Sequence, residues 1–268
     1  MRKVFFCIIT AFIIAGCSSG PIPPEAEIIP KELTANGHTR IDNYFWLNER
    51  DNPKVINYLN AENEYAAAMM KGTEVLQNKL YNEIVGRIKQ DDESLPYKEN
   101  GYYYYTKFLK GKEYPVYCRK KGSLENPEEI ILDVNELAKG HNYFSVSGIS
   151  VSPDNGKIAF GVDTVSRRKY DLYFKDLSSG KITDDRINNT TGQIVWANDN
   201  KTVFYILKDN TLRPFKVMKH SIGMASAVDK MSFMETDETF NVGISKTKSK
   251  KYIIISSSST LSDEHRIL

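Results

Sequence analysis

The sequence predicts a mainly β fold, a β-propeller of about four blades, preceded by a helical segment. Three observations carry this prediction. Apolar residues follow helical spacing between residues 53 and 90, they alternate with period two from Leu95 onward, and a turn-and-strand phrase recurs in that second region. The chain of 268 residues also contains 16 Tyr and 12 Phe, and aromatic side chains favour strands.

The N-terminus, "MRKVFFCIITAFIIAGCSSG", has the pattern of a secretory signal. A short basic start precedes an apolar run at 4–15, which is too short to span a bilayer as a helix. The following "IAGC" resembles a bacterial lipobox, so we expect a signal peptide at 1–16 and a lipid on Cys17. Ser18 fits sorting to the outer membrane, facing the periplasm. The alternatives are a buried N-terminal helix, or a plain signal with an incidental Cys.

Residues 17–36 are rich in Pro and Gly, which predicts an extended tether without regular structure. The next segment, 37–92, is predicted to be helical. Pro53 marks a helix start with Asn52 as its N-cap, and Thr73 is positioned to cap a second helix. Apolar stripes along both helices indicate packing faces. The stripes comprise Val55, Tyr58, Leu59, Glu62, Tyr65 and Met69 in the first helix, and Val75, Leu76, Leu80, Ile84 and Ile88 in the second.

The recurring phrase marks the hairpin between the first two strands of each blade. "SPDNGKIAF" starts at Ser152 and "WANDNKTVFY" at Trp196, and both place an Asn-containing turn before an apolar strand. The turns fall near Asn100, Asn155, Asn200 and Ser249. Four strands per repeat of roughly 45 residues are typical of propeller blades, because stacked sheets bury faces that a lone sheet cannot. The expected blades are 93–140, 141–188, 189–236 and 237–268. A sandwich and a β-solenoid are the alternatives.

Charge and cysteine content argue against a nucleic-acid partner and against cysteine or metal chemistry. The chain has 36 basic and 34 acidic residues, and removal of Arg2 and Lys3 with the signal leaves it near neutral, which argues against a nucleic-acid partner. Cys7 would leave with the signal and Cys17 would carry lipid. Cys118 alternates within "YPVYCRK", which predicts a structural Cys in a strand. A single remaining thiol cannot form an internal disulfide. No Cys or His has metal-ligand spacing, so we expect no metal, and we also expect no cofactor.

The sequence contains no clear catalytic nucleophile. The nearest match to the G-x-S-x-G elbow of α/β-hydrolases is Gly148-Ile149-Ser150-Val151-Ser152, which lacks the second Gly and lies in an alternating strand. His141 is interpreted as a surface or structural residue in a loop, and the other histidines, His38, His220 and His265, are scattered. We therefore assign no catalytic residue.

Four charged or aromatic runs have structural interpretations. Asp91-Asp92-Glu93 is expected to be a solvated linker rather than an acid–base pair. Arg167-Arg168-Lys169 is expected to be a solvated hairpin tip, with a partner contact as the alternative. The lysines at 246, 248, 250 and 251 are expected to form a charged turn. The run Tyr102–Tyr105 is expected to alternate faces in a strand and to pack in the core.

Several longer segments resemble the prolyl oligopeptidase family of serine peptidases. "RIDNYFWLNERDNPKVINYLNAENEY" is similar to that family's entry segment. "LYNEIVGRIKQDDESLPYKENGYYYYTKFLKGKEYPVYCRKKG" and "EEIILDVNELAKGHNYFSVSGISVSPDNGKIAFGVD" resemble its oligopeptidase B (protease II) branch. The resemblance begins near residue 38. It implies a seven-bladed propeller that caps an α/β-hydrolase domain, admits short peptides, and belongs to an enzyme that cleaves after Arg or Lys. The helical segment would pack on the hydrolase domain.

The resemblance further implies that the catalytic Ser, Asp and His belong to a C-terminal hydrolase domain, so none transfers to these residues. The fold expected is then an incomplete seven-bladed propeller, and the chain is expected to be a fragment that is inactive alone. Two other hypotheses remain open. One is a non-enzymatic, lipid-anchored propeller fragment that binds a protein or peptide through its exposed edge. The other is a product without function.

Overall fold

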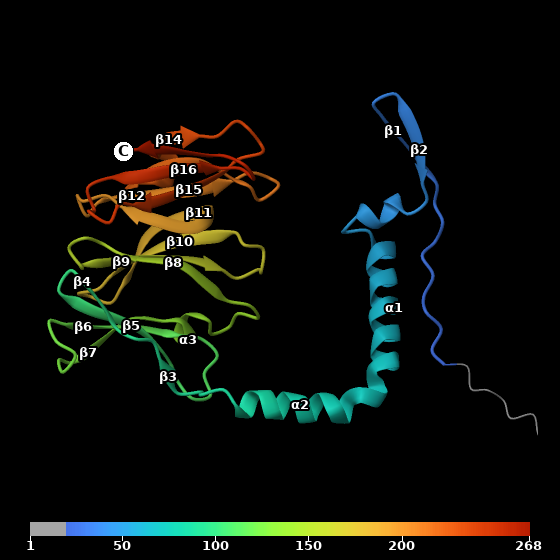
Figure 1. The fold of residues 1–268 in the computed structure, drawn as a ribbon, viewed down its shortest axis with the longest axis horizontal. Coiled ribbons are helices and arrows are strands. Elements are labelled where there is room, and N and C mark those ends of the chain that lie inside the picture. The colour runs from blue at the N-terminus through green and yellow to red at the C-terminus, as the bar shows by residue number, and fades with distance from the viewer. Residues whose placement is uncertain (1–19) are drawn as a thin grey trace, which may run out of the picture. The chain divides into compact units, whose positions relative to one another are not determined.

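The computed structural model describes residues 20–268, which divide into two compact units, one ending at Ile88 and one comprising Lys89–Leu268. The expected signal peptide and Cys17 lie outside the described residues. Figure 1 shows the elements of both units in chain order.

The first unit begins with a β-hairpin where the sequence predicts an irregular tether. Strand β1 (Lys31–Ala35) pairs antiparallel with β2 (His38–Asp42). The expectation of no regular structure up to residue 36 is therefore wrong for its last residues. The reason is the Asn36–Gly37 pair, whose φ values of 52° and 80° suit a tight two-residue hairpin turn.

Two helices, joined by a short 3₁₀ turn, follow a first 3₁₀ turn, η1 (Phe45–Asn48). The first is α1 (Pro53–Met70), and its predicted N-cap is confirmed, because the Asn52 side chain accepts a hydrogen bond from the Lys54 amide at 2.9 Å. The turn η2 (Lys71–Thr73) leads into α2 (Glu74–Gly86).

The predicted capping role of Thr73 is wrong. Its hydroxyl donates back to the Met70 carbonyl at 2.7 Å and accepts from Gln77, and it makes no capping bond to α2. The chain passes from α1 through η2 without leaving helical conformation, so Thr73 has a backbone conformation unlike that of an N-cap.

The two apolar stripes are largely exposed. In the stripe of α1, Val55 is buried, whereas Leu59 and Met69 are exposed. Trp46 of η1 is also buried, and its indole N–H donates to the Glu27 carbonyl at 2.9 Å. The stripe of α2 is also exposed, so the packing face expected for this helix has no partner within the described residues of the first unit. Its exposed residues are Val75, Leu76, Leu80, Ile84 and Ile88.

The second unit opens with a blade built on Tyr-rich strands. Strands β5, β6 and β7 pair in chain order, and both β3 and β4 pair with β5. A four-residue helix, α3 (Val134–Leu137), follows and is capped by the Asp133 side chain. The strands are β3 (Asp92–Glu93), β4 (Tyr97–Glu99), β5 (Tyr102–Phe108), β6 (Val116–Lys121) and β7 (Glu128–Asp133).

The next two blades share one continuous seven-stranded sheet. Neighbouring strands pair antiparallel in chain order from β8 to β14, with the 3₁₀ turn η3 (Ser226–Val228) before the last. The strands are β8 (Ser145–Val151), β9 (Lys157–Asp163), β10 (Tyr170–Asp176), β11 (Ile182–Trp196), β12 (Thr202–Lys208), β13 (Pro214–Ser221) and β14 (Lys230–Met234).

The expected blade boundary at residue 188 falls inside strand β11. The first part of β11 pairs with β10, and its last residues pair with β12, so one strand ends the second blade and starts the third. The chain thus changes partner strands without a loop. Glycine permits β8 and β11 to approach closely here, because a Cβ built on Gly148 of β8 would lie only 1.6 Å from the Gly192 carbonyl oxygen.

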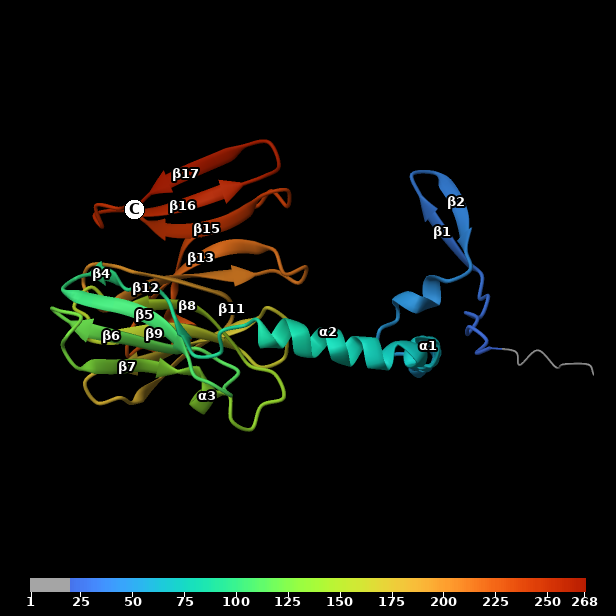
Figure 2. The ribbon, with the colours of Figure 1, turned by 60° about the horizontal axis from the view of Figure 1, so that its bottom comes forward.

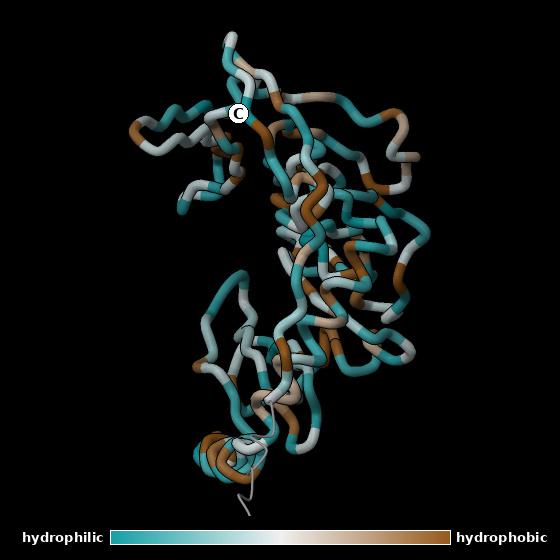
Figure 3. The backbone as a smooth tube through the Cα atoms, turned by 90° about the vertical axis from the view of Figure 1, so that its right-hand side faces the viewer, coloured by the Kyte–Doolittle hydropathy of each residue, from teal (hydrophilic) through white to brown (hydrophobic). Residues whose placement is uncertain are grey.

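The last sheet comprises β15 (Asn241–Lys246), β16 (Ile253–Ser258) and β17 (Asp263–Ile267). Within this unit the sheets stack face to face, and Figures 1 and 2 show them as successive layers. Figure 3 shows hydrophobic segments among hydrophilic ones in this unit. Strands β9 and β12 are buried in continuous runs, Ile158–Asp163 and Val203–Ile206, as expected for strands covered on both faces.

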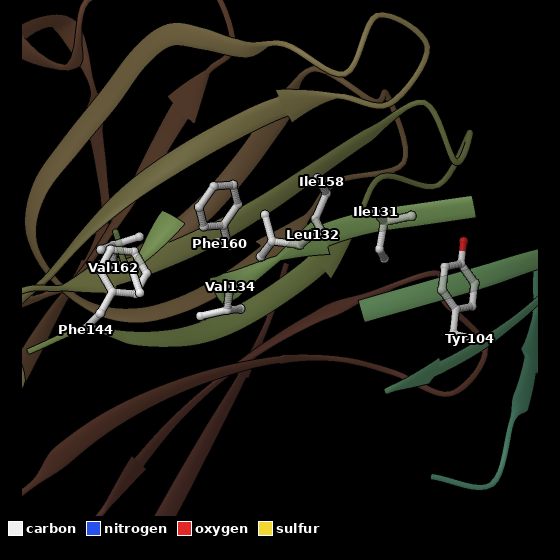
Figure 4. Close-up of a cluster of buried hydrophobic side chains, with 9 residues drawn as sticks. Tyr104, Ile131, Leu132, Val134, Phe144, Ile158, Phe160 and Val162 are labelled. Atoms are coloured by element: carbon white, nitrogen blue, oxygen red, sulfur yellow. The ribbon is translucent and has the colours of Figure 1, made fainter. Parts of the chain in front are cut away.

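A hydrophobic cluster lies at each junction between successive blades. Figure 4 shows the cluster of the first two blades, where Leu132 and Phe160 are almost fully buried. The second cluster includes Phe174 and Trp196, and the third includes Ile206 and Ile255. Each core therefore forms between neighbouring sheets in chain order, which confirms the predicted propeller stacking.

Candidate functional site

The four hairpin turns between the first and second strands of the blades carry the repeated phrase of the sequence. Asn100, Asn155 and Asn200 occupy the predicted positions with φ values of 44°, 59° and 58°. Asn tolerates this left-handed region better than most residues do. In the fourth turn, predicted near Ser249, the residue with positive φ is Lys250, at 60°.

Side-chain hydrogen bonds join these turns from blade to blade. The Asn155 amide group donates to the Asn100 carbonyl at 3.1 Å, which links the first two turns. The Asn200 side-chain oxygen accepts from the Asp154 backbone N–H at 2.9 Å, which links the second and third. The repeated Asn therefore both permits the tight turn and binds the neighbouring turn.

Two further bonds complete the series. The Asn198 side-chain amide donates to the Lys250 carbonyl at 2.9 Å, which links the third and fourth turns. The Lys250 ammonium then donates to Glu99 Oε1 at 2.5 Å and to Asn100 Oδ1 at 3.1 Å. The fourth turn is thereby joined to the first, and the four turns form a closed series, which we call the turn circuit (residues 98–100, 153–155, 198–200 and 246–250).

The turn circuit borders a cavity of about 720 Å³. Its wall combines aromatic rings with backbone and amide groups. The Tyr104 hydroxyl donates to Asn155 Oδ1 at 2.9 Å, and the Trp196 indole N–H donates to the Ser150 carbonyl at 3.1 Å. The aromatic residues that line the cavity are Tyr97, Tyr104, Tyr105, Tyr117 and Trp196. Walls of this kind offer apolar surface with a few fixed polar atoms, as binding sites for small molecules do.

Lysine side chains supply the positive charge at the cavity. The Lys246 ammonium donates to the Trp196 carbonyl at 2.8 Å and to Asn198 Oδ1 at 2.7 Å. Burial, followed by the nearby charge of Lys250, lowers the pKa of Lys246. The predicted charged turn therefore has a structural role that the sequence does not indicate: Lys246 bonds the third blade, and Lys250 bonds the first.

Cys118 lines the same cavity but is buried, with 1% of its surface exposed. Burial raises the pKa of its thiol to about 12, so the thiol is protonated at neutral pH. The adjacent Tyr105 hydroxyl has its pKa raised by burial and by its hydrogen bond to Glu128. These properties agree with the structural role predicted for Cys118.

The serines of the partial G-x-S-x-G match lie in and after strand β8, not at a strand-to-helix elbow. Ser150 contributes its carbonyl to Trp196, and the Ser152 hydroxyl donates to Asp154 Oδ1 at 2.5 Å. Ser152 is fully buried. Both residues therefore support the second hairpin turn.

The four histidines lie in four different environments. His38 is exposed in β2, and the His141 ring lies 5.3 Å from that of Phe144. His265 Nδ1 lies 2.9 Å from Ser256 Oγ on the exposed face of the last sheet. The structure does not bring these residues together.

Sequence reasoning missed the buried cluster around His220. Its Nδ1 lies 2.8 Å from Asp229 Oδ1, and the Tyr205 hydroxyl donates to Asp229 Oδ2 at 2.8 Å. No spacing in the sequence predicts this cluster, because Asp229 lies directly after η3 while the other two residues lie in β12 and β13.

The charged runs have different outcomes. The linker interpretation is wrong for Asp92 and Glu93, which form strand β3 and pair with β5. The tip at Arg167-Arg168-Lys169 is exposed as predicted. Its backbone N–H groups are held by the buried Asp163 carboxylate, which accepts from Arg167 at 3.0 Å and from Arg168 at 2.7 Å.

Within residues 20–268, no group of three or more His, Cys, Asp or Glu side chains is arranged to hold a metal ion. No helix in the same range is long and apolar enough to cross a membrane.

Comparison with known proteins identifies the second unit and much of the first. The family model for the prolyl oligopeptidase N-terminal β-propeller domain matches residues 23–268. Dipeptidyl aminopeptidase BI of Pseudoxanthomonas mexicana is 38% identical over 95% of this chain, and Protease 2 of Moraxella lacunata is 33% identical over 91%. Oligopeptidase B from Leishmania major superimposes with a TM-score of 0.87 at 32% identity over 93% of this chain.

The chain spans 38%, 36% and 38% of the lengths of these three proteins. The matching family model describes the N-terminal β-propeller domain, and the similarity to these proteins extends to both sequence and structure. The chain therefore belongs to the prolyl oligopeptidase family, in which it corresponds to the N-terminal β-propeller domain.

Proposed function

We propose that the chain is the substrate-admitting propeller of a serine oligopeptidase that resembles oligopeptidase B and hydrolyses short peptides after Arg or Lys. The observation that carries this proposal is the cavity of about 720 Å³ bordered by the turn circuit, in a chain of this family. The catalytic Ser, Asp and His would come from an α/β-hydrolase domain outside these 268 residues, so the chain alone is inactive.

The size and walls of the cavity support a filter for substrates. Its volume lies within the range of small-molecule pockets, roughly 300–1,000 Å³, so it fits part of a peptide and not a folded domain. Aromatic rings such as Tyr97 and Trp196 provide apolar surface for any peptide side chain. Such a site selects by chain thickness more than by sequence.

The exposed stripe of α2 is the proposed docking face for the hydrolase domain. Leu76 is 56% exposed and Ile84 is 60% exposed, although both belong to the apolar side of an amphipathic helix. Full burial of one such side chain contributes about 1.5–3 kcal/mol. Several of them together provide a strong reason for this helix to pack against another domain.

We also propose that a lipid on Cys17 anchors the protein to the envelope of a bacterium, at the outer membrane facing the periplasm. Support comes from the signal-like N-terminus alone. Growth with an alkyne-tagged fatty acid should label the wild-type chain and leave Cys17→Ser unlabelled. Labelling of Cys17→Ser to the same extent would contradict lipid attachment at this residue.

A chimera tests the proposed peptidase function. Residues 23–268 replace the matching segment of the Pseudoxanthomonas mexicana relative, which supplies the rest of an enzyme. We expect the folded chimera to hydrolyse a short fluorogenic peptide with Arg before the cleaved bond, and a serine-directed inhibitor to abolish this activity. A dipeptidyl substrate tests the other activity, the one that the name of this relative states. A folded chimera inactive on both peptides would contradict the proposal and favour a non-enzymatic binding role.

A further inference from the structure

The turn circuit has one link that differs from the others. Three links join consecutive blades, and each uses a backbone atom, namely the Asn100 carbonyl, the Asp154 N–H or the Lys250 carbonyl. The link from the fourth blade to the first depends on the Lys250 side chain, which spans to Glu99 and Asn100. These blades are not neighbours in the chain, and the residues joined are 151 positions apart.

This link is also accessible to water. The side chains of Lys250 and Glu99 are 46% and 44% exposed. An ion pair with this exposure contributes little to stability and is screened by salt. Lys246, on the same hairpin, is more firmly held, because its ammonium bonds the Trp196 carbonyl and Asn198. The positive charge of Lys246 additionally repels that of Lys250, and this repulsion adds to burial, the larger cause, in lowering the pKa of Lys246.

We propose that Lys250 and Glu99 form a salt-sensitive latch that closes the turn side of the cavity. Both residues line the cavity, so their separation widens its border between the first and fourth blades. The other three links remain in place when the latch opens, because they do not involve the Lys250 ammonium. The latch controls peptide access only if the proposed function holds, but its opening is a property of this chain that is measured without any substrate.

Spin-label distances test the latch directly. Nitroxides are attached to a keto amino acid introduced in place of Lys98 and Lys251, which are exposed and adjacent to the paired residues. This chemistry leaves the cysteines unmodified. We expect one short distance at low salt and a longer population at 1 M salt, where the screening length is about 3 Å. Lys250→Gln and Glu99→Gln should show the longer population even at low salt.

Lys248→Gln is the matched control, because Lys248 lies in the same turn and lines the cavity without a recorded ion pair to Glu99. It should keep the short distance at low salt. The charge-swapped double variant, Glu99→Lys with Lys250→Glu, should restore it too. Far-UV circular dichroism confirms that each variant folds. An unchanged distance in folded Lys250→Gln, or one insensitive to salt in the wild-type chain, would overturn the latch. Peptidase activity plays no part in either outcome.

Discussion

His220 Nδ1 lies 2.8 Å from Asp229 Oδ1, and the two side chains are only 1% and 2% exposed. Asp229 also accepts the Tyr205 hydroxyl, so one buried carboxylate holds side chains from β12 and β13. A buried polar group destabilises the fold unless it has a hydrogen-bond partner, and this carboxylate is the partner of two such groups, His220 and Tyr205. The cluster therefore fixes the chain between η3 and β14 against the third blade.

We expect Asp229→Ala to lower the free energy of unfolding by about 3 kcal/mol, because it leaves two buried donors, at His220 and Tyr205, without their acceptor. Urea denaturation measures the change. The neighbouring Lys230→Ala is the control, since Lys230 is exposed and should change stability by less than about 0.5 kcal/mol. Equal stability of the two variants would show that the cluster contributes nothing.

Gly148→Ala should be among the most damaging small substitutions in the second unit. The new Cβ would lie 1.6 Å from the Gly192 carbonyl oxygen, at a φ of +64° that favours glycine. We expect a loss of about 3 kcal/mol or more, or failure to fold. Gly243→Ala, in β15, introduces a Cβ with no atom within 4 Å and should be nearly neutral. Comparable melting temperatures for the two variants would contradict the close approach of β8 and β11.

Acid stability should depend on Asp176, the last residue of β10 before the turn to β11. Hydrogen bonds, first from the Ser178 hydroxyl and then from Ser179, lower the pKa of this carboxyl from 3.8 to about 2. A depressed carboxyl pKa stabilises the fold above the unfolded value, and this contribution is lost as the pH falls from about 4 to about 2.

Asp176→Asn should therefore lose stability at pH 7 and show a shallower decline between pH 4 and pH 2 than the wild-type chain. Denaturation midpoints across this range provide the measurement. Asp184→Asn, on the exposed part of β11, is the control and should keep the wild-type slope. A parallel decline in Asp176→Asn would refute the role given to this carboxyl.

Substitutions on the exposed stripe of α2 should separate docking from folding. Ile84→Asp and Leu80→Asp should leave the stability of the chain almost unchanged, because both side chains are already exposed. In the chimera the same changes should reduce peptide hydrolysis at least tenfold, since they place a charge in an apolar interface. Asn78→Asp, on the opposite side of the helix by its 3.6-residue period, should preserve activity. Full activity of Ile84→Asp would exclude this face from docking.

Local signals in the sequence were sufficient for the turns and the first helix. Asn100, Asn155 and Asn200 were recognisable because few residues accept a positive φ, and Asn52 with Pro53 specifies a helix start on its own. The cavity was not predictable in this way. Its border depends on bonds such as Lys250 to Glu99, whose partners come from different blades, and no local pattern encodes that distance.

The errors have a common physical origin in tertiary context. Thr73 has the chemistry of a helix cap, yet the chain turns through η2 without leaving helical conformation. No loop marks the predicted blade boundary near residue 188, because β11 pairs first with β10 and then with β12. The linker at Asp92 becomes a strand because β5 offers it a free edge. In each case a neighbouring element, rather than the local sequence, decides the conformation.

Size selection by the chimera tests the central claim, that this propeller admits peptides and excludes folded proteins. The same Arg-containing bond is presented in a short peptide and in an exposed loop of a stably folded carrier protein, and the two hydrolysis rates are compared. We predict rapid cleavage of the peptide and at least a hundredfold slower cleavage of the carrier. Equal rates on both substrates would contradict the claim.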